Sequence, residues 1–241
     1  MRRFAAYILL ALSHITLNAQ VGDRRTDFAV GVTGGGVMNT MTFQPSIKQD
    51  MLFGPTFGVA ARYISEKYFT CICGLVGEVN YTQLGWKENI ENSTDTYHRT
   101  IPYIQIPLMM QLGWGRERKG CKFVFEAGPQ FGYALNYTEH KSEPFNMDHR
   151  PNNITEQYGM DIDNKVDYGI TAGLGIEHSS SIGHFILGAR YYYGLGDIFD
   201  NSKKGFFGRS AHGTISLKLT YLFDIVRTKT ADTPQPTTGS R

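Results

Sequence analysis

The sequence is poor in cysteine and in charge of either sign. Its 241 residues include three cysteines, Cys71, Cys73 and Cys121, too few for a disulfide framework and odd in number, so at most one bridge forms. Charged residues make up 19% of the chain, and 24 Lys and Arg residues nearly balance 22 Asp and Glu residues. We therefore expect no nucleic-acid partner, because no segment offers the concentrated positive charge that such a partner requires.

Long apolar runs are also rare. Arg2 and Arg3 precede the apolar residues from Phe4 to Leu12, and Ala19 is a small residue of the kind that signal peptidase requires. This run is much shorter than the roughly 20 apolar residues of a membrane-spanning helix, and no later segment reaches that length. We therefore expect residues 1–19 to be a signal peptide for Sec-dependent export, and the mature chain to carry no formal net charge.

What the chain has in abundance is glycine and aromatic residues, with 27 Gly, 15 Phe and 14 Tyr. The segment Ile101–Gly115 illustrates their setting. Pro107 would break a helix there, whereas a strand would place apolar side chains on one face and Tyr103, Gln105 and Gln111 on the other. The apolar face would consist of Ile104, Ile106, Leu108, Met110, Leu112 and Trp114. Because Pro107 lacks a backbone N–H, we also expect a β-bulge at this residue.

Eight segments alternate in this way, each close to the roughly 9 to 11 residues of a membrane-spanning strand. In the fifth, for example, Phe131, Tyr133, Leu135 and Tyr137 share the apolar face. The eight segments are Phe28–Met38, Thr56–Ile64, Cys73–Gln83, Ile101–Gly115, Lys122–Thr138, Val166–Glu177, Phe185–Gly194 and His212–Phe223.

The connections between these segments alternate in length. Short turns of Ser65–Thr70, Arg116–Cys121 and His178–His184 alternate with long polar loops, of which Glu139–Lys165 is the longest. Such alternation is typical of outer-membrane barrels. The sequence therefore predicts an all-β fold over residues 20–223, an eight-stranded antiparallel up-and-down transmembrane β-barrel with short periplasmic turns and long extracellular loops.

Seven charged residues fall on the polar, lumen-facing side of the predicted strands. Four acids and three bases in a closed interior should pair, because an isolated buried charge costs several kcal/mol. An ion path is the alternative, but side chains fill the interior of an eight-stranded barrel. We therefore expect a structural ion-pair network of Arg62, Glu78, Glu126, Asp167, Glu177, Arg190 and Lys218.

Five stretches of the chain resemble the PorT-like family of bacterial outer-membrane β-barrels, whose members are often labelled porin-family proteins. The resemblance implies an eight-stranded outer-membrane barrel and implies no chemistry. One branch of that family is associated with type IX secretion and gliding, and the shared barrel motifs alone do not transfer that role. The stretches are "GEVNYTQLGWK" (77–87), "YIQIPLMMQLGW" (103–114), "EAGPQFGYAL" (126–135), "DYGITAGLGIE" (167–177) and "ARYYYGLGDI" (189–198).

Other features fit a structural interpretation better than a catalytic one. Ser210 and His212 could serve a lipid hydrolase only from the outer face, and the alternation places both on the lumen face. The loop Glu139–Lys165 contains His140, Asp148, His149, Asp161 and Asp163 without the spacing of a metal site, so we expect a solvated loop. We expect Trp86, Trp114, Tyr192 and Tyr193 to form an interfacial aromatic girdle.

The three cysteines and the C-terminus complete the predictions. Cys121 begins the fifth strand and Cys71 and Cys73 the third, so the fourth strand should separate them beyond disulfide reach and leave mainly free thiols. Residues 224–241 are rich in Pro and Thr and poor in apolar residues, and we expect them to be a disordered periplasmic tail.

The sequence thus favours a non-enzymatic barrel without cofactors in the outer membrane of a Gram-negative bacterium. We expect a structural or interaction module, one form of which would be an accessory of protein secretion or surface assembly. Its partners would be outer-membrane lipid and envelope or secretion-system proteins that contact the extracellular loops or the C-terminal tail. A narrow porin for ions or very small solutes is the alternative, and an outer-membrane lipid hydrolase is a weaker one.

Overall fold

The computed structural model describes residues 23–90, 94–116, 119–145, 154–201 and 205–228. The expected signal peptide (1–19), Asp148 and His149, and residues 229–241 of the expected tail lie outside the described residues. Within these limits the secondary structure consists of strands, and no described helix has the length and apolarity to traverse a bilayer.

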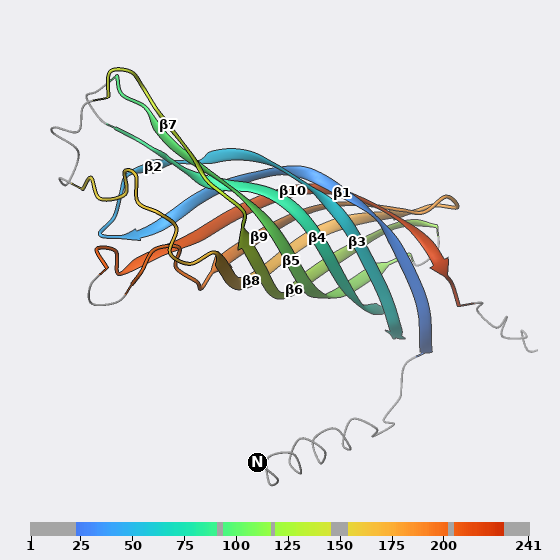
Figure 1. Ribbon diagram of the computed structural model, residues 1–241. Helices are drawn as coiled ribbons and strands as arrows, with labels where there is room; N and C mark the ends of the chain where they lie inside the picture. Colours follow the sequence, from blue (N-terminus) through green and yellow to red (C-terminus); the bar gives the residue numbers. More distant parts are fainter. Residues whose placement is uncertain (1–22, 91–93, 117–118, 146–153, 202–204, 229–241) are drawn as a thin grey trace, which may run out of the picture.

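Eight long strands and two short ones make up the fold (Figure 1). The short strands are β2 (Gln49–Asp50) and β7 (Thr138–Lys141). The long strands are β1 (Asp23–Gln44), β3 (Leu52–Tyr68), β4 (Cys71–Glu88), β5 (Tyr97–Gly115), β6 (Gly120–Ala134), β8 (Val166–Ser179), β9 (His184–Gly194) and β10 (Arg209–Val226).

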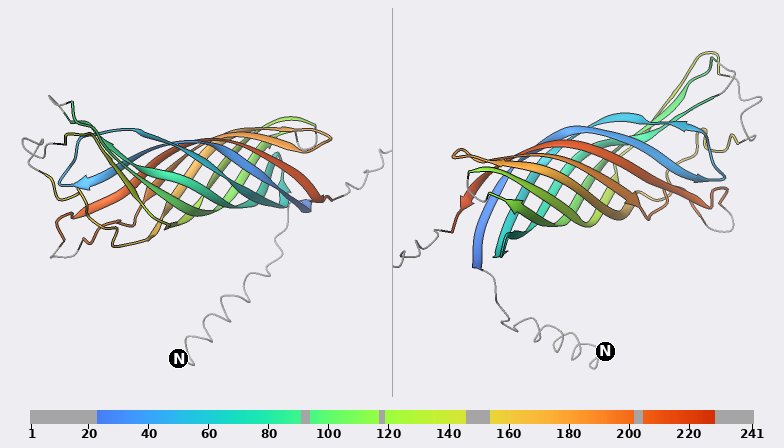
Figure 2. Two further views of the ribbon diagram at one scale, coloured as in Figure 1. Left: turned by 45° about the horizontal axis from the view of Figure 1, so that its top comes forward. Right: turned by 180° about the vertical axis from the view of Figure 1, so that it is seen from behind.

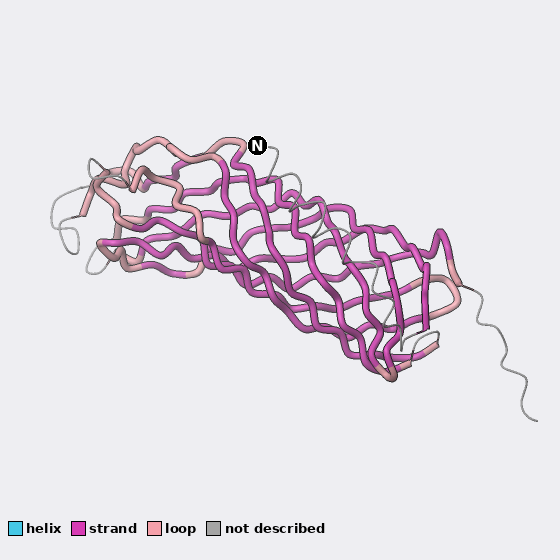
Figure 3. The backbone as a smooth tube through the Cα atoms, turned by 90° about the horizontal axis from the view of Figure 1, so that it is seen from below, coloured by secondary structure: helices cyan, strands magenta, loops and turns pink. Residues whose placement is uncertain are grey.

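The eight long strands close into a ring of antiparallel neighbours. Each pairs with the next along the chain, and β1 pairs with β10 over residues 28–44 to complete the barrel. The strand ends beside the short connections 69–70, 116–119 and 180–183 lie at one end of the barrel, which we call the turn end. The strand ends beside the long connections lie at the other, the loop end (Figures 2 and 3). The predicted up-and-down barrel is confirmed.

The alternation of side chains between the two faces is also confirmed. In β5, Tyr103, Gln105 and Gln111 are buried in the lumen, while Leu108 and Met110 are more than half exposed on the outer surface. The other long strands alternate in the same way. Large apolar side chains therefore cover the outside of the barrel, which is the arrangement that hydrocarbon requires.

The expected bulge at Pro107 is wrong. Gly77 lies opposite Leu108 and Asn80 lies opposite Gln105, so β4 and β5 keep one register across the proline. On the other side, Pro107 pairs with Gln130 of β6. The missing N–H therefore interrupts the ladder on the β4 side alone, and the ring absorbs this loss without an extra residue.

Two of the four expected girdle aromatics point inward instead. Trp114 and Tyr193 are exposed on the outer face as predicted, but Trp86 is fully buried and Tyr192 is 4% exposed. The alternation explains both, since Trp86 shares the face of Glu78 and Tyr192 that of Arg190. Similarly, β6 ends at Ala134, and Tyr137 packs against buried residues of the loop end and not toward lipid.

The last strand runs three residues beyond the predicted boundary at Phe223. Val226 pairs with Phe28, and a carboxylate oxygen of Asp224 lies 3.1 Å from Nε2 of His184 on β9. The backbone N–H of Thr228 donates a hydrogen bond of 2.5 Å to Asp27. Residues 224–228 of the expected tail are therefore part of the barrel rim, because they continue its ladder and its polar contacts.

The apolar side chains on the outer surface predict that a charge introduced there lowers stability more in the middle of the membrane than near its edge. Leu174 lies in the middle of β8 and Val166 at its loop end, and they are 53% and 59% exposed. We expect Leu174→Arg to lower the free energy of unfolding in lipid vesicles by about 2–4 kcal/mol and Val166→Arg by at most about 1 kcal/mol. Denaturant titration in vesicles, followed by the gel shift of folded barrel, measures both. Equal costs at the two positions would contradict this placement in the membrane.

Candidate functional site

The middle of the lumen holds an ion-pair cluster that joins four strands. Arg190 of β9 lies 2.9 Å from Glu78 of β4 and 2.7 Å from Glu126 of β6. Lys218 of β10 approaches the second oxygen of Glu78 at 2.5 Å, and Gln111 donates to Glu126. Two bases and two acids thus neutralise one another in a site that solvent barely reaches.

Glycine makes room for this cluster. A Cβ added at Gly173 of β8 would lie 2.5 Å from the Cγ of Arg190, so a side chain there would displace the arginine from its two carboxylates. The space beside the cluster, lined in part by Asn80, Gln105 and Tyr192, amounts to about 20 Å³. That is room for about one water molecule.

A second cluster closes the turn end. Glu177 of β8 is fully buried and accepts from Arg62 of β3 at 2.7 Å and from Lys122 of β6 at 2.9 Å. His184 of β9 places Nδ1 2.7 Å from Glu177 and Nε2 3.1 Å from Asp224 of β10. Each ring nitrogen of His184 therefore faces a carboxylate, and the ring connects β8, β9 and β10.

Ser179 adds a hydroxyl to this cluster without making a nucleophile of it. Its Oγ lies 3.0 Å from His184 Nδ1, and Asp224 lies on the other side of the ring. In a hydrolase the imidazole nitrogen beside the serine must be free to accept the serine proton. Here that nitrogen faces Glu177, and Ser179 is 1% exposed, so this arrangement suits a structural role.

The structure brings together six of the seven predicted lumen charges and sets Asp167 apart. Asp167 faces the lumen, but within the described residues its side-chain partner is the hydroxyl of Tyr192, at 2.7 Å, and not a base. Sequence reasoning missed Lys122 and His184. Both lie on the lumen face of their strands, so the alternation carries the signal that would have found them.

Aromatic side chains fill the loop end of the lumen. Trp86, Tyr97 and Phe199 are almost fully buried there with Phe43 and Phe207. Arg99 of β5 lies among them, fully buried, with its guanidinium 3.8 Å from the ring centre of Tyr137 and 3.4 Å from Glu139. We call this group of side chains the mouth cluster, and it covers the ion pairs below it.

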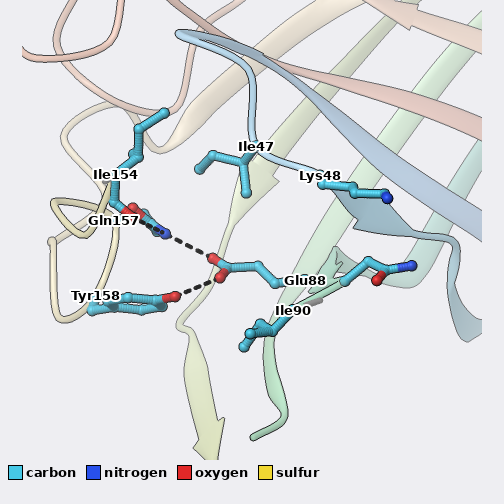
Figure 4. A pocket seen from close by; sticks show the side chains of 8 residues that line it. Ile47, Lys48, Glu88, Ile90, Ile154, Gln157 and Tyr158 are labelled. Carbon is cyan, nitrogen blue, oxygen red and sulfur yellow. Dashed lines mark hydrogen bonds between the residues drawn. The ribbon is translucent and has the colours of Figure 1, made fainter. Parts of the chain in front are cut away.

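The segment 154–160 closes over the mouth cluster and is anchored to β4. Gln157 donates to Glu88 at 3.0 Å, and the hydroxyl of Tyr158 donates to its other oxygen at 2.6 Å (Figure 4). Glu139 forms a second anchor. Burial tends to raise the pKa of Glu139, but the Gly159 N–H, the Tyr97 hydroxyl, Lys141 and Arg99 together hold it below its usual value. Glu139 is therefore ionised at neutral pH, and Glu88 and Glu139 both hold the loop through hydrogen bonds.

Ser210 and His212 lie inside the barrel, as the alternation predicts, and do not contact one another. Ser210 accepts a hydrogen bond from the backbone N–H of Phe199, and His212 contacts Asn39 and the hydroxyl of Tyr103. Both are at most 1% exposed. Their surroundings give neither the pairing nor the access to lipid that hydrolysis needs.

The three cysteines are free thiols at the turn end. Cys71 and Cys73 lie on β4 and Cys121 on β6, with β5 between them, as expected. Cys121 is exposed, with its sulfur 3.5 Å from Nδ1 of His178.

Comparison with protein families decides what kind of barrel this is. A family model described as an outer membrane protein beta-barrel domain matches residues 18–200. The chain belongs to the outer membrane β-barrel family. The turn end of this outer membrane β-barrel therefore faces the periplasm, and the loop end with its mouth cluster faces the outside of a Gram-negative cell.

Solved barrels from other bacteria are similar to it at low identity. Ail, the attachment invasion locus protein of Yersinia pestis, is 13% identical, with a TM-score of 0.38 over 82% of this chain and 99% of Ail. Neisserial surface protein A is 13% identical, with a TM-score of 0.41 over 81% and 97% of the two chains. OprG from Pseudomonas aeruginosa is 12% identical, with a TM-score of 0.42 over 84% and 98%. Such distant likenesses say nothing of a shared ligand, and no curated protein matches significantly.

The ion-pair cluster in the middle of the lumen predicts that Arg190 contributes more to the free energy of unfolding than Asp167, a lumen acid outside the cluster. We expect Arg190→Met to cost about 3–5 kcal/mol of unfolding free energy, because it leaves two buried carboxylates facing one another. Asp167→Asn is the matched control and should cost at most about 1 kcal/mol, since Tyr192 keeps an acceptor. Denaturant titration measures both. Adding Glu126→Gln to Arg190→Met should recover part of the loss, and simple additivity of the two costs would argue against the cluster.

The hydrogen bonds of Glu88 predict that its removal loosens the segment 154–160 and leaves the barrel strands unchanged. Glu88→Ala removes the acceptor of Gln157 and Tyr158, whose bonds to a carboxylate are worth about 1.5–3 kcal/mol each. We expect amide hydrogen exchange over residues 154–160 to accelerate at least about tenfold, while the barrel strands keep their protection. Glu156→Ala, an exposed neighbour in the same segment, should leave exchange at Gln157 and Tyr158 unchanged. If both variants behave alike, Glu88 does not anchor the loop.

Proposed function

We propose that this outer membrane β-barrel is a closed, non-enzymatic module that presents its extracellular loops to other molecules. The filled lumen carries the proposal. The middle cluster leaves space for about one water molecule, and the mouth cluster buries Trp86, Tyr97 and Arg99 above it. Ions would have to cross both layers, the second of which is largely apolar.

The loop end supports a role in interaction. Its connections are long, and two carboxylates, Glu88 and Glu139, hold the segment 154–160 against the barrel. Loops that a rigid scaffold positions are where binding residues concentrate. The turn end, in contrast, offers short turns to the periplasm. Within the described residues, the extracellular side is therefore the larger surface for a partner.

The finer form of the proposal is an accessory of protein secretion or surface assembly. Its support is the resemblance of the barrel motifs to the PorT-like family, one branch of which is associated with type IX secretion. The partner would be an envelope protein that contacts the extracellular loops or the C-terminal tail. Deletion of the gene should reduce the export of surface proteins while leaving envelope permeability unchanged, and a variant that lacks residues 229–241 would show whether the tail carries the contact.

A closed lumen predicts the absence of steady conductance. We expect purified protein in planar bilayers to give no reproducible single-channel steps, and vesicles that contain it to show no faster swelling in small sugars or salts than empty vesicles. The narrow porin makes the opposite prediction. Uniform conductance steps that scale with protein concentration and vanish with denatured protein would overturn the closed module in favour of that porin.

A further inference from the structure

Strand β5 forms a hairpin with β6 and with β7, which follows β6 along the chain. The part of this hairpin made by β5 and β7 extends past the other strands at the loop end (Figures 1 and 2). Residues 97–100 pair with residues 138–141, and His98 lies directly opposite His140. The two imidazole rings stack with their centres 4.4 Å apart and their planes at 18°. Most of β5, a short turn and all of β6 separate these histidines in the sequence, so their spacing alone does not reveal the pair.

The pair lies on the outer face of the hairpin and beyond the lipid. His98 shares its face with Ile104, the first of the lipid-facing apolar residues of β5 counted from the loop end. The two residues are six positions apart along the strand, a distance of about 20 Å. The intervening residues of that face, Thr100 and Pro102, are half-buried and not large apolar groups. His98 is half-buried and His140 is exposed, so a solute outside the cell can reach both rings.

Imidazole is largely neutral at physiological pH, because its ordinary pKa is about 6.5. A neutral ring offers a free nitrogen lone pair at physiological pH, which is the form that binds metals. Imidazole suits copper, nickel and zinc, and carboxylates or water complete such sites.

We propose that His98 and His140 form a two-imidazole site for a divalent copper, nickel or zinc ion on the extracellular face of the hairpin. Bonds from nitrogen to zinc of about 2.0–2.1 Å require the two donor atoms to lie about 3–4 Å apart. Directly opposed residues on antiparallel strands have Cβ atoms about 4.5–5.5 Å apart, so turning the stacked rings edge-on brings one nitrogen of each to that separation.

The surroundings set the strength of this site. Within the described residues, His, Cys, Asp and Glu side chains form no cluster of three or more that could hold a metal. The proposed site therefore has two donors from that part of the chain, and water would fill the other positions. Lys87 of β4 lies opposite His98, and its positive charge opposes that of the ion. Glu139 and Lys141 point to the other side of β7, toward Tyr97. The site is therefore a weak, exposed one that a surface metal or a metal-bearing partner could reach.

Titration of the purified barrel with Cu²⁺, and separately with Zn²⁺, tests the proposal. The chain should carry Cys71, Cys73 and Cys121 as serine, so that thiols do not compete for the metal. We expect one site at pH 7.5 that weakens as the pH falls through about 6.5, where imidazole protonates. His98→Ala and His140→Ala should each lower the affinity at least tenfold, and Lys87→Gln should raise it about three- to tenfold.

Controls separate metal binding from damage to the hairpin. Thr138→Ala changes the same hairpin without touching a ring nitrogen and should bind as the parent does. Heat-dependent gel mobility reports whether each variant has folded. The proposal is wrong if the parent binds no metal, if the histidine variants bind as tightly as the parent, or if Lys87→Gln weakens binding.

Discussion

The structure depends on the closure of eight strands into one ring. Because β1 pairs with β10, each of the eight long strands has a neighbour on both sides, and each of their side chains has two destinations, the surroundings or a narrow lumen. A charge that falls on the inner face must find its partner there. The contacts of Arg190 with Glu78 and Glu126 across three strands follow from this constraint, since an unpaired charge in that space would cost several kcal/mol.

The same constraint produces the closed mouth. The strands continue past the lipid-facing band, so their inner faces at the loop end still converge on the lumen axis. There they carry Trp86 and Tyr97 together with Arg99, which pairs with Glu139. The loops supply Phe199 and the segment 154–160 as a cover. The lumen is thus polar in its middle and at the turn end, and apolar where it meets the outside.

The period-two alternation made most of the barrel predictable. It placed the strands and the facing of β5, and six of the seven charged residues predicted for the lumen network form ion pairs in the structure. Two predictions were wrong because residue type was given more weight than the alternation. Trp86 and Tyr192 were assigned to a girdle by residue type, although their position in the alternation places them inside. The cover of the mouth cluster could not be predicted, because Glu88 meets Gln157 and Tyr158 only when a distant loop folds back.

Access of water to the lumen is the most direct test of a closed barrel. Thr171 is 2% exposed in the lumen and Cys121 is exposed at the turn end. A chain with Thr171→Cys, and with Cys71 and Cys73 as serine, can be treated in vesicles with a membrane-impermeant thiol reagent from both sides. The closed barrel predicts rapid modification of Cys121 and none of the lumen thiol over the same period. Comparable rates at the two positions would show that the lumen is open.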